Sequence, residues 1–132
     1  MAAILDTHAA VWYLLDSKKL PLRVFELIDG AAGSGEPVYI SAVTLVEVAY
    51  LVERRRIPAN TFDMFVAELR DKNPAFVTVP LDSQVAEALR TIPGKDIPDM
   101  PDRIIAATAV HLGVPLVTRD RRIQAAGIQT IW

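Results

Sequence analysis

The sequence predicts an α/β fold with a mainly parallel central sheet of about five strands flanked by helices. Short apolar runs alternate with longer segments that carry apolar residues at helical spacing, which is the order expected of a parallel sheet. Some of the short runs are continuously apolar, as in strands that are covered on both faces. With 132 residues, 52% of them apolar, the chain suits one domain with its own core, residues 1–132.

The first half of the chain supplies two strands and three helices. We expect strands at Ala2–Leu5 and Val38–Ile40, and helices at Ala9–Leu15, from Leu22 to about Ala32 and from Ser41 to about Arg55. Pro21 opens the second helix, because the first helical turn tolerates a residue that lacks an N–H donor. The helix that follows Ser41 is apolar nearly all round, which predicts that it is buried.

The second half supplies three further strands and four helices. We expect helices at Thr61–Leu69, Ser83–Arg90, Asp102–Leu112 and Arg121–Ala126, and strands at Phe76–Val79, Val114–Val117 and Ile128–Trp132. Asn60 and Asp82 are the predicted N-caps of the first two of these helices. Pro101 suits the first turn of the third helix, and Gly113 suits its C-terminal cap.

The segment from Asp99 to Asp120 brings acidic residues together. Its helix rises roughly 16 Å from Asp102 onward, at about 1.5 Å per residue. The chain that runs back as far as Arg119 covers about 17–20 Å, at roughly 3.3 Å per residue. The return therefore places Asp120 level with Asp102, at one edge of the sheet. Packing does not require carboxylates there, whereas a bound cation would.

Two further acids are expected at the same edge, because ligands of parallel sheets lie outside the carboxyl ends of the strands. Asp6 ends the first strand, and Glu47 lies about a turn into the helix after the second strand. Each has a structural alternative. Asp6 can cap the following helix, and Glu47 can close a capping box with Thr44. The local sequence leaves the two readings of Glu47 about equal.

The composition narrows the kind of site. The chain has no cysteine and only two histidines, which argues against thiolate and histidine-rich metal sites. The chain has 14 Lys and Arg against 16 Asp and Glu, for a net charge of −2. This balance argues against a protein that coats nucleic acid without sequence preference. No apolar run approaches the length of a membrane span and no basic segment precedes the N-terminal apolar residues, so we expect a soluble cytoplasmic protein.

Carboxylate oxygens without His or Cys select hard cations, which makes Mg²⁺ or Mn²⁺ the expected metal. The reaction class that fits such a site is metal-assisted hydrolysis of a phosphodiester. We assign Asp6, Asp102 and Asp120 as metal ligands, directly or through water, and Glu47 as a ligand or a water-orienting base. Asp99 is a weaker member of the ligand set, because it can simply cap the helix at Pro101.

Four other polar side chains lie near the predicted site in the sequence. Thr118 can hydrogen-bond Asp120 or a metal-bound water, although strands often carry threonine at such positions. Arg103 and Arg119 can steer a phosphate group or pair with the acids. His8 receives no role, because a histidine at a helix end is more often a packing residue.

These motifs occur together in one known family. Ile4-Leu5-Asp6-Thr7-His8, the helix around Glu47, the segment Asp99–Ala109 and Leu116-Val117-Thr118-Arg119-Asp120 stand in the order seen in PIN-domain ribonucleases. The chain closely resembles the VapC-like toxin component of VapBC-type toxin–antitoxin systems, over essentially its whole length. The short length and the ending Gly127–Trp132 also resemble that group.

The resemblance implies a three-layer PIN-like fold and Mg²⁺- or Mn²⁺-dependent cleavage of RNA by water, giving a 5′-phosphate and a 3′-hydroxyl. It maps the acidic quartet onto Asp6, Glu47, Asp102 and Asp120, with Asp99 as a frequent extra acid and Thr118 as a supporting residue. It further implies a homodimer, a cognate antitoxin that covers the acidic pocket, and growth inhibition through cleavage of tRNA, rRNA or mRNA.

Other functions fit the sequence less well. A haloacid-dehalogenase-like phosphatase needs a second acid two residues after Asp6, where His8 stands. A receiver domain needs an acidic pair at the first strand and a lysine after the last strand, and neither is evident. A catalytically weak PIN-like module that binds RNA or a partner without cutting is the remaining alternative.

Overall fold

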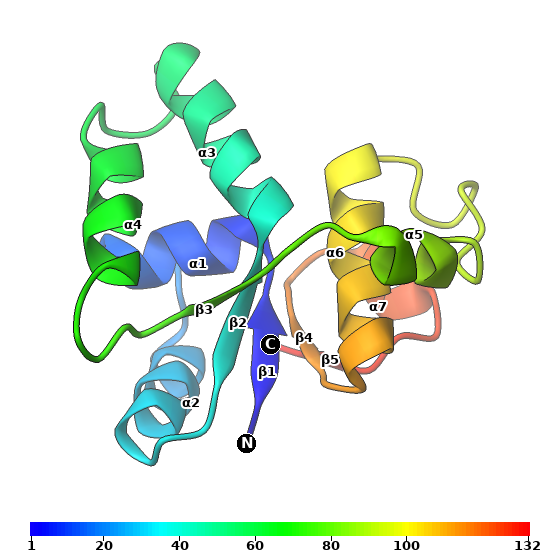
Figure 1. Ribbon diagram of the computed structural model, residues 1–132, viewed down its shortest axis with the longest axis horizontal. Coiled ribbons are helices and arrows are strands. Elements are labelled where there is room, and N and C mark those ends of the chain that lie inside the picture. The colour runs from blue at the N-terminus through cyan, green and yellow to red at the C-terminus, as the bar shows by residue number, and fades with distance from the viewer.

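The computed structural model describes all 132 residues and contains five strands and seven helices (Figure 1). In chain order these are β1 (Ala3–Leu5), α1 (Thr7–Leu14), α2 (Leu22–Gly33), β2 (Val38–Ser41), α3 (Ala42–Glu53), α4 (Thr61–Leu69), β3 (Val77–Val79), α5 (Ser83–Leu89), α6 (Met100–Leu112), β4 (Leu116–Val117), α7 (Arg121–Ala125) and β5 (Thr130–Ile131). The predicted α/β class is confirmed. None of the helices has both the length and the apolar character needed to cross a membrane.

All five strands are parallel and lie in the order β3-β2-β1-β4-β5. β1 is central: Leu5 stands opposite Ile40 of β2 on one side and Val117 of β4 on the other. The carboxyl ends of the strands therefore meet at one edge, as the sequence predicts. The chain leaves this edge into α1 after β1, into α3 after β2 and into α7 after β4.

Helices cover both faces of the sheet and create two hydrophobic cores (Figure 1). The first core includes Trp12, Ile28 and Phe65, from α1, α2 and α4. The second includes Ile105 and Ile123, from α6 and α7. The resulting arrangement is three layers, with the thin central sheet buried between the two helical layers.

The element boundaries differ from the predictions at the segment that carries most of the acids. β4 begins at Leu116 rather than Val114, because Pro115 has no N–H to donate; its carbonyl accepts from Ile4 N at 3.0 Å. α6 begins at Met100, two residues earlier than predicted, because the Asp99 side chain caps it. Gly113 ends this helix with a φ of 68°, as predicted.

α3 is not the buried helix that its composition predicts. Only Val43, Thr44 and Val48 are buried, while Val46 and Tyr50 are more than half exposed, at 54% and 53%. Leu45 and Val52 pack partly against the first core, so the exposed apolar surface of this helix is formed by Val46 and Tyr50.

The two predicted caps of α4 and α5 have different outcomes. Asp82 caps α5 as predicted and accepts from Val85 N at 3.0 Å. Asn60 occupies the cap position of α4, but its side chain makes no capping hydrogen bond. Instead the Thr61 hydroxyl donates to the carbonyl of Pro58 at 2.7 Å, which ties the loop to the start of the helix.

Candidate active site

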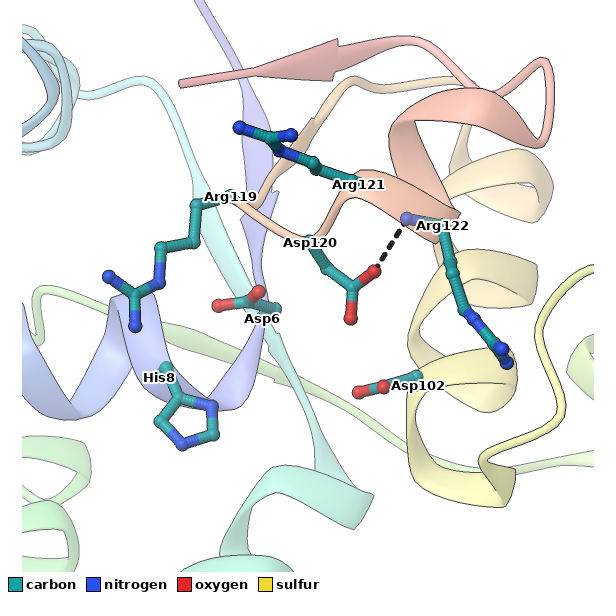
Figure 2. A pocket seen from close by; sticks show the side chains of 7 residues that line it. All are labelled: Asp6, His8, Asp102, Arg119, Asp120, Arg121 and Arg122. Atoms are coloured by element: carbon teal, nitrogen blue, oxygen red, sulfur yellow. Dashed lines mark hydrogen bonds between the residues drawn. The ribbon is translucent and has the colours of Figure 1, made fainter.

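A polar cavity of about 500 Å³ lies at the carboxyl edge of the sheet (Figure 2). Three aspartates from three separate elements open into it: Asp6 after β1, Asp102 in the first turn of α6 and Asp120 before α7. Its other walls are His8, Arg119, Arg121 and Arg122. No hydrophobic side chain lines the cavity, so its walls suit a charged, hydrated ligand.

Asp6 is fixed at the end of the central strand. Its backbone N–H continues the ladder by donating to the carbonyl of Val117 at 3.1 Å, and its side chain caps α1 by accepting from Ala9 N at 2.8 Å. The side chain is only 9% exposed, and this burial raises the pKa of Asp6 against the lowering effect of the Thr118 hydroxyl and Ala9 N–H. Asp6 therefore caps α1, as its structural reading expects, and its side chain also lines the cavity.

Asp120 is also both a cap and a cavity residue. One carboxylate oxygen accepts from the backbone N–H groups of Arg122, at 2.8 Å, and Ile123, at 3.3 Å (Figure 2). Its own N–H donates to the Thr118 hydroxyl at 3.0 Å. The predicted contact between Thr118 and Asp120 thus exists, through the backbone of Asp120. It fixes the exit from β4, and Figure 2 shows the carboxylate directed toward the cavity.

Asp102 is a second aspartate of the cavity whose pKa is raised. Burial is the largest cause, and the charges of Asp99, Glu47 and Asp120 add to it, so that the pKa of Asp102 rises to about 7. Its backbone N–H donates to the side chain of Asp99 at 3.1 Å, which confirms Asp99 as the cap of α6. Asp99 itself is outside the main cavity and lines two smaller cavities beside it.

Glu47 approaches the site from α3. The helix begins after Ser41, whose side chain accepts from Val43 N at 3.1 Å, so the capping box with Thr44, one of the two readings left open for Glu47, is not formed. Glu47 instead accepts a short hydrogen bond from the Thr7 hydroxyl. Burial raises its pKa, this hydrogen bond lowers it, and Asp99 then raises it further. Glu47 therefore lies within the electric field of the other acids, although it does not line the same cavity.

No arginine or lysine forms an ion pair with any of these acids. The single ion pair in the structure joins the N-terminal amine to Glu36, and neither residue lines the cavity. No three His, Asp or Glu side chains are arranged to hold one metal ion among them. The acids thus form an open cluster whose charges disfavour one another, although Arg119, Arg121 and Arg122 line the same cavity without pairing to them.

Arg103 does neither of the things predicted for it. Its guanidinium turns toward the loop after α5 and donates to the carbonyls of Ile92, at 2.9 Å, and Leu89, at 3.2 Å. Those bonds attach α6 to the preceding helix, and Arg103 does not line the acidic cavity. Arg119, in contrast, stands at the cavity with its guanidinium carbon 4.6 Å from the ring centroid of Trp12.

Three residues to which the sequence assigned no role line the cavity: His8, Arg121 and Arg122. His8 is exposed and stands one helical residue beyond Thr7, at the cavity wall (Figure 2). Arg121 and Arg122 follow Asp120 directly and complete the opposite wall. All three follow closely after the end of a strand, at the edge where the site was predicted, and that position could have identified them.

The sequence matches the family described as PIN domain over residues 3–128. The chain belongs to the PIN domain family. A ribonuclease named VapC22 from Mycobacterium tuberculosis is 29% identical over 122 residues, which span 92% of this chain and 89% of that protein. The predicted PIN-like fold is therefore confirmed.

Solved structures share the PIN fold along the whole chain. VapBC2 from Rickettsia felis bound to a promoter DNA fragment superposes with a TM-score of 0.75 at 15% identity, covering 99% of this chain and 98% of that chain. FitAcB from Neisseria gonorrhoeae has a TM-score of 0.67 at 24% identity, covering 98% of this chain and 96% of that chain. DNA-bound VapBC from Salmonella typhimurium has a TM-score of 0.71 at 21% identity, covering 99% of this chain and 97% of that chain.

Proposed function

We propose that this PIN domain is a divalent-cation-dependent endoribonuclease and the toxin of a toxin–antitoxin pair, acting on RNA in the cytoplasm. The observation that carries the proposal is the convergence of Asp6, Asp102 and Asp120, from three elements, on one cavity in which none of the three carboxylates is in an ion pair. Similarity to the ribonuclease VapC22 supports RNA as the substrate.

The acidic residues fit Mg²⁺ or Mn²⁺ better than other metals. Every acidic donor is a carboxylate oxygen, which hard cations prefer. Mg²⁺ commonly takes one or two carboxylates and keeps several waters, so it does not require three preassembled ligands. A bound dication would also offset the two effects that raise the pKa of Asp102 to about 7, which are the cost of burying its charge and the repulsion from neighbouring carboxylates.

In the proposed reaction each acid has a role set by its place. Asp6, Asp102 and Asp120 hold the cation, with Asp99 at the margin, and Glu47 orients water or completes the ligand set. When bound, the cation polarises the phosphoryl group and stabilises the leaving oxygen. Water then adds to phosphorus, the bond from phosphorus to the 3′ oxygen breaks, and the 3′ oxygen takes up a proton. The products are a 5′-phosphate and a 3′-hydroxyl.

An antitoxin partner is supported by the fold neighbours, among them VapBC complexes from Rickettsia felis and Salmonella typhimurium. The cavity suggests how such a partner would inhibit this chain. A basic side chain placed among Asp6, Asp102 and Asp120 would take the position of the cation. We therefore propose that a cognate antitoxin covers this cavity.

We also propose that the chain forms a homodimer. Val46 and Tyr50 of α3 and Met100 of α6 are exposed at 54%, 53% and 67%, and they surround one cavity between these two helices. A second copy of the chain placed here would cover the face of α3 whose composition predicted burial. We expect Tyr50→Glu to halve the mass measured by light scattering after gel filtration, and Leu22→Glu, at an exposed apolar residue of α2, to leave it unchanged.

A cleavage assay tests the proposed nuclease. Wild type and Asp6→Asn are incubated with end-labelled structured RNAs in Mg²⁺ or Mn²⁺, and the product ends are identified. We expect the wild type alone to cut, with activity lost in EDTA. Equal cleavage by both proteins would refute the assigned site. Tight RNA binding without cleavage by the wild type would favour the alternative, a catalytically weak PIN-like binding module.

A further inference from the structure

A second cavity of about 410 Å³ adjoins the acidic one and shares two wall residues with it, His8 and Arg119. Its chemistry is different. Apolar side chains from α1, α3 and the following loop form much of its wall: Val11, Leu15, Leu51 and Ile57. Cations stand around these apolar groups, and no carboxylate lines the cavity. The function proposed for the acids does not account for this second site.

Two of the cationic side chains lie over the same aromatic ring, that of Trp12. The Arg119 guanidinium carbon lies 4.6 Å, and the Lys19 Nζ 5.9 Å, from the ring centroid of Trp12. Trp12 is 8% exposed, so its ring supports the cations from below rather than offering a free face. Neither cation is in an ion pair with a carboxylate. Both therefore remain available to an anionic ligand.

The loops that carry Lys19 and Arg56 begin with the same backbone motif. After α1, Ser17 N donates to Trp12 O at 2.8 Å; after α3, Arg56 N donates to Leu51 O at 2.9 Å. Each turn passes through a residue of positive φ, Asp16 at 52° and Arg55 at 57°. These hydrogen bonds anchor both loops to helix ends that also line the cavity, which places the cations of the two loops at defined positions.

We propose that this second cavity binds an unpaired nucleotide of the RNA substrate, beside the phosphodiester that the acidic cavity cleaves. The apolar wall and the exposed His8 ring suit the face of a nucleobase, and the surrounding Lys19, Arg56 and Arg119 suit its flanking phosphates. A volume of about 410 Å³ is within the range of small-molecule sites. An unpaired base has a free face to place against such a wall, so we expect the site to favour single-stranded or bulged RNA.

This inference rests on the proposed ribonuclease function, but its test does not need cleavage. Binding of a fluorescein-labelled single-stranded RNA hexamer is followed by anisotropy in Mg²⁺, with Asp6→Asn as the common background. Lys19→Gln is compared with Lys18→Gln, and Arg56→Gln with Arg55→Gln. Every variant removes one exposed positive charge, and the two positions of each pair are adjacent in the chain, but only Lys19 and Arg56 line the cavity.

We expect Lys19→Gln and Arg56→Gln each to weaken binding about 5- to 10-fold at low salt and to flatten its salt dependence, because each removes a phosphate contact. The control variants should bind as the background does. A hexamer with abasic positions should bind about 5-fold or more weakly than the intact one. Thermal unfolding of all variants checks that the fold is retained.

Two results would overturn the inference. Equal affinities within each pair would show that the cavity does not contact RNA, whether or not the wild type cleaves it. Equal binding of intact and abasic hexamers, together with displacement by a glutamate-rich peptide, would assign the cavity to an acidic protein segment. A wild-type protein that does not cleave RNA would count against the proposed function. The binding comparison in the Asp6→Asn background would still test the second cavity.

Discussion

The two neighbouring cavities differ in almost everything except the wall they share. The acidic cavity has no apolar lining and contains three aspartates, whereas the second combines apolar side chains with cations around Trp12. Their juxtaposition separates two tasks. The acidic cavity suits a cation and the reacting phosphate, and its neighbour suits the parts of a substrate that do not react. His8 and Arg119 stand where the two meet.

The largest expected effect is on cleavage by the acidic cavity. We expect Asp120→Asn to lower the cleavage rate on the order of 100- to 1000-fold, because it removes a charge that would hold the cation. Asparagine still caps a helix, so the fold should be retained. Asp82→Asn is the matched control, since Asp82 caps α5 in the same way without lining the acidic cavity. A rate for Asp120→Asn within twofold of the control would contradict the assignment.

Glu47 should matter less, because it acts from the margin of the cavity. We expect Glu47→Gln to lower the cleavage rate about 10- to 100-fold, as loss of a supporting carboxylate typically does. The amide oxygen can still accept from the Thr7 hydroxyl, so the effect would report the lost charge. Glu53→Gln, on the exposed end of the same helix, serves as the control. Single-turnover cleavage of one labelled RNA measures both.

Arg103 should separate stability from activity. Its two hydrogen bonds to the carbonyls of Leu89 and Ile92 join α6 to the segment before it. We expect Arg103→Met to lower the free energy of unfolding by about 1–2 kcal/mol, because two carbonyls lose a donor. Denaturant unfolding measures this change. The cleavage rate per folded molecule should stay the same. A large loss of that rate without a matching loss of stability would show that Arg103 takes part in the site.

The smallest expected effect is on the pH dependence of stability without metal. The pKa of Asp102 is raised from 3.8 to about 7 in the folded chain, so folding favours its protonated form. This contribution is complete below pH 3.8 and is lost as pH rises through 7. After allowance for solvent screening it is about 1 kcal/mol. We expect Asp102→Asn in EDTA to lose less stability between pH 5 and pH 8 than the wild type does.

The sequence predicted the acidic cavity better than its neighbour because strand ends are easy to locate. Asp6 and Asp120 each follow an apolar strand directly, and parallel topology then brings them to one edge. The second cavity combines Trp12, Arg56 and Arg119, which come from three separate segments. Its shape depends on how two loops leave their helices, and local sequence patterns do not specify that.

The remaining errors have local causes. The capping box that the sequence left open for Glu47 does not form, because α3 starts at the end of β2 and Ser41 takes the cap position. Composition predicted a buried α3, but composition does not say which surface covers a helix, and much of that face is exposed in the isolated chain. Arg103 was assigned by its nearness to Asp102, whereas neighbouring residues of a helix point in different directions.

The measurement that tests the separation of the two cavities most directly is single-turnover cleavage at increasing protein concentration. Asp120→Asn and a Lys19→Gln/Arg56→Gln double variant are compared with wild type on the same RNA in Mn²⁺. We predict that Asp120→Asn lowers the limiting rate with little change in the half-saturating concentration. The double variant should raise that concentration while the limiting rate stays within a few-fold of wild type. The reverse pattern, or the same loss of limiting rate in both variants, would contradict the account.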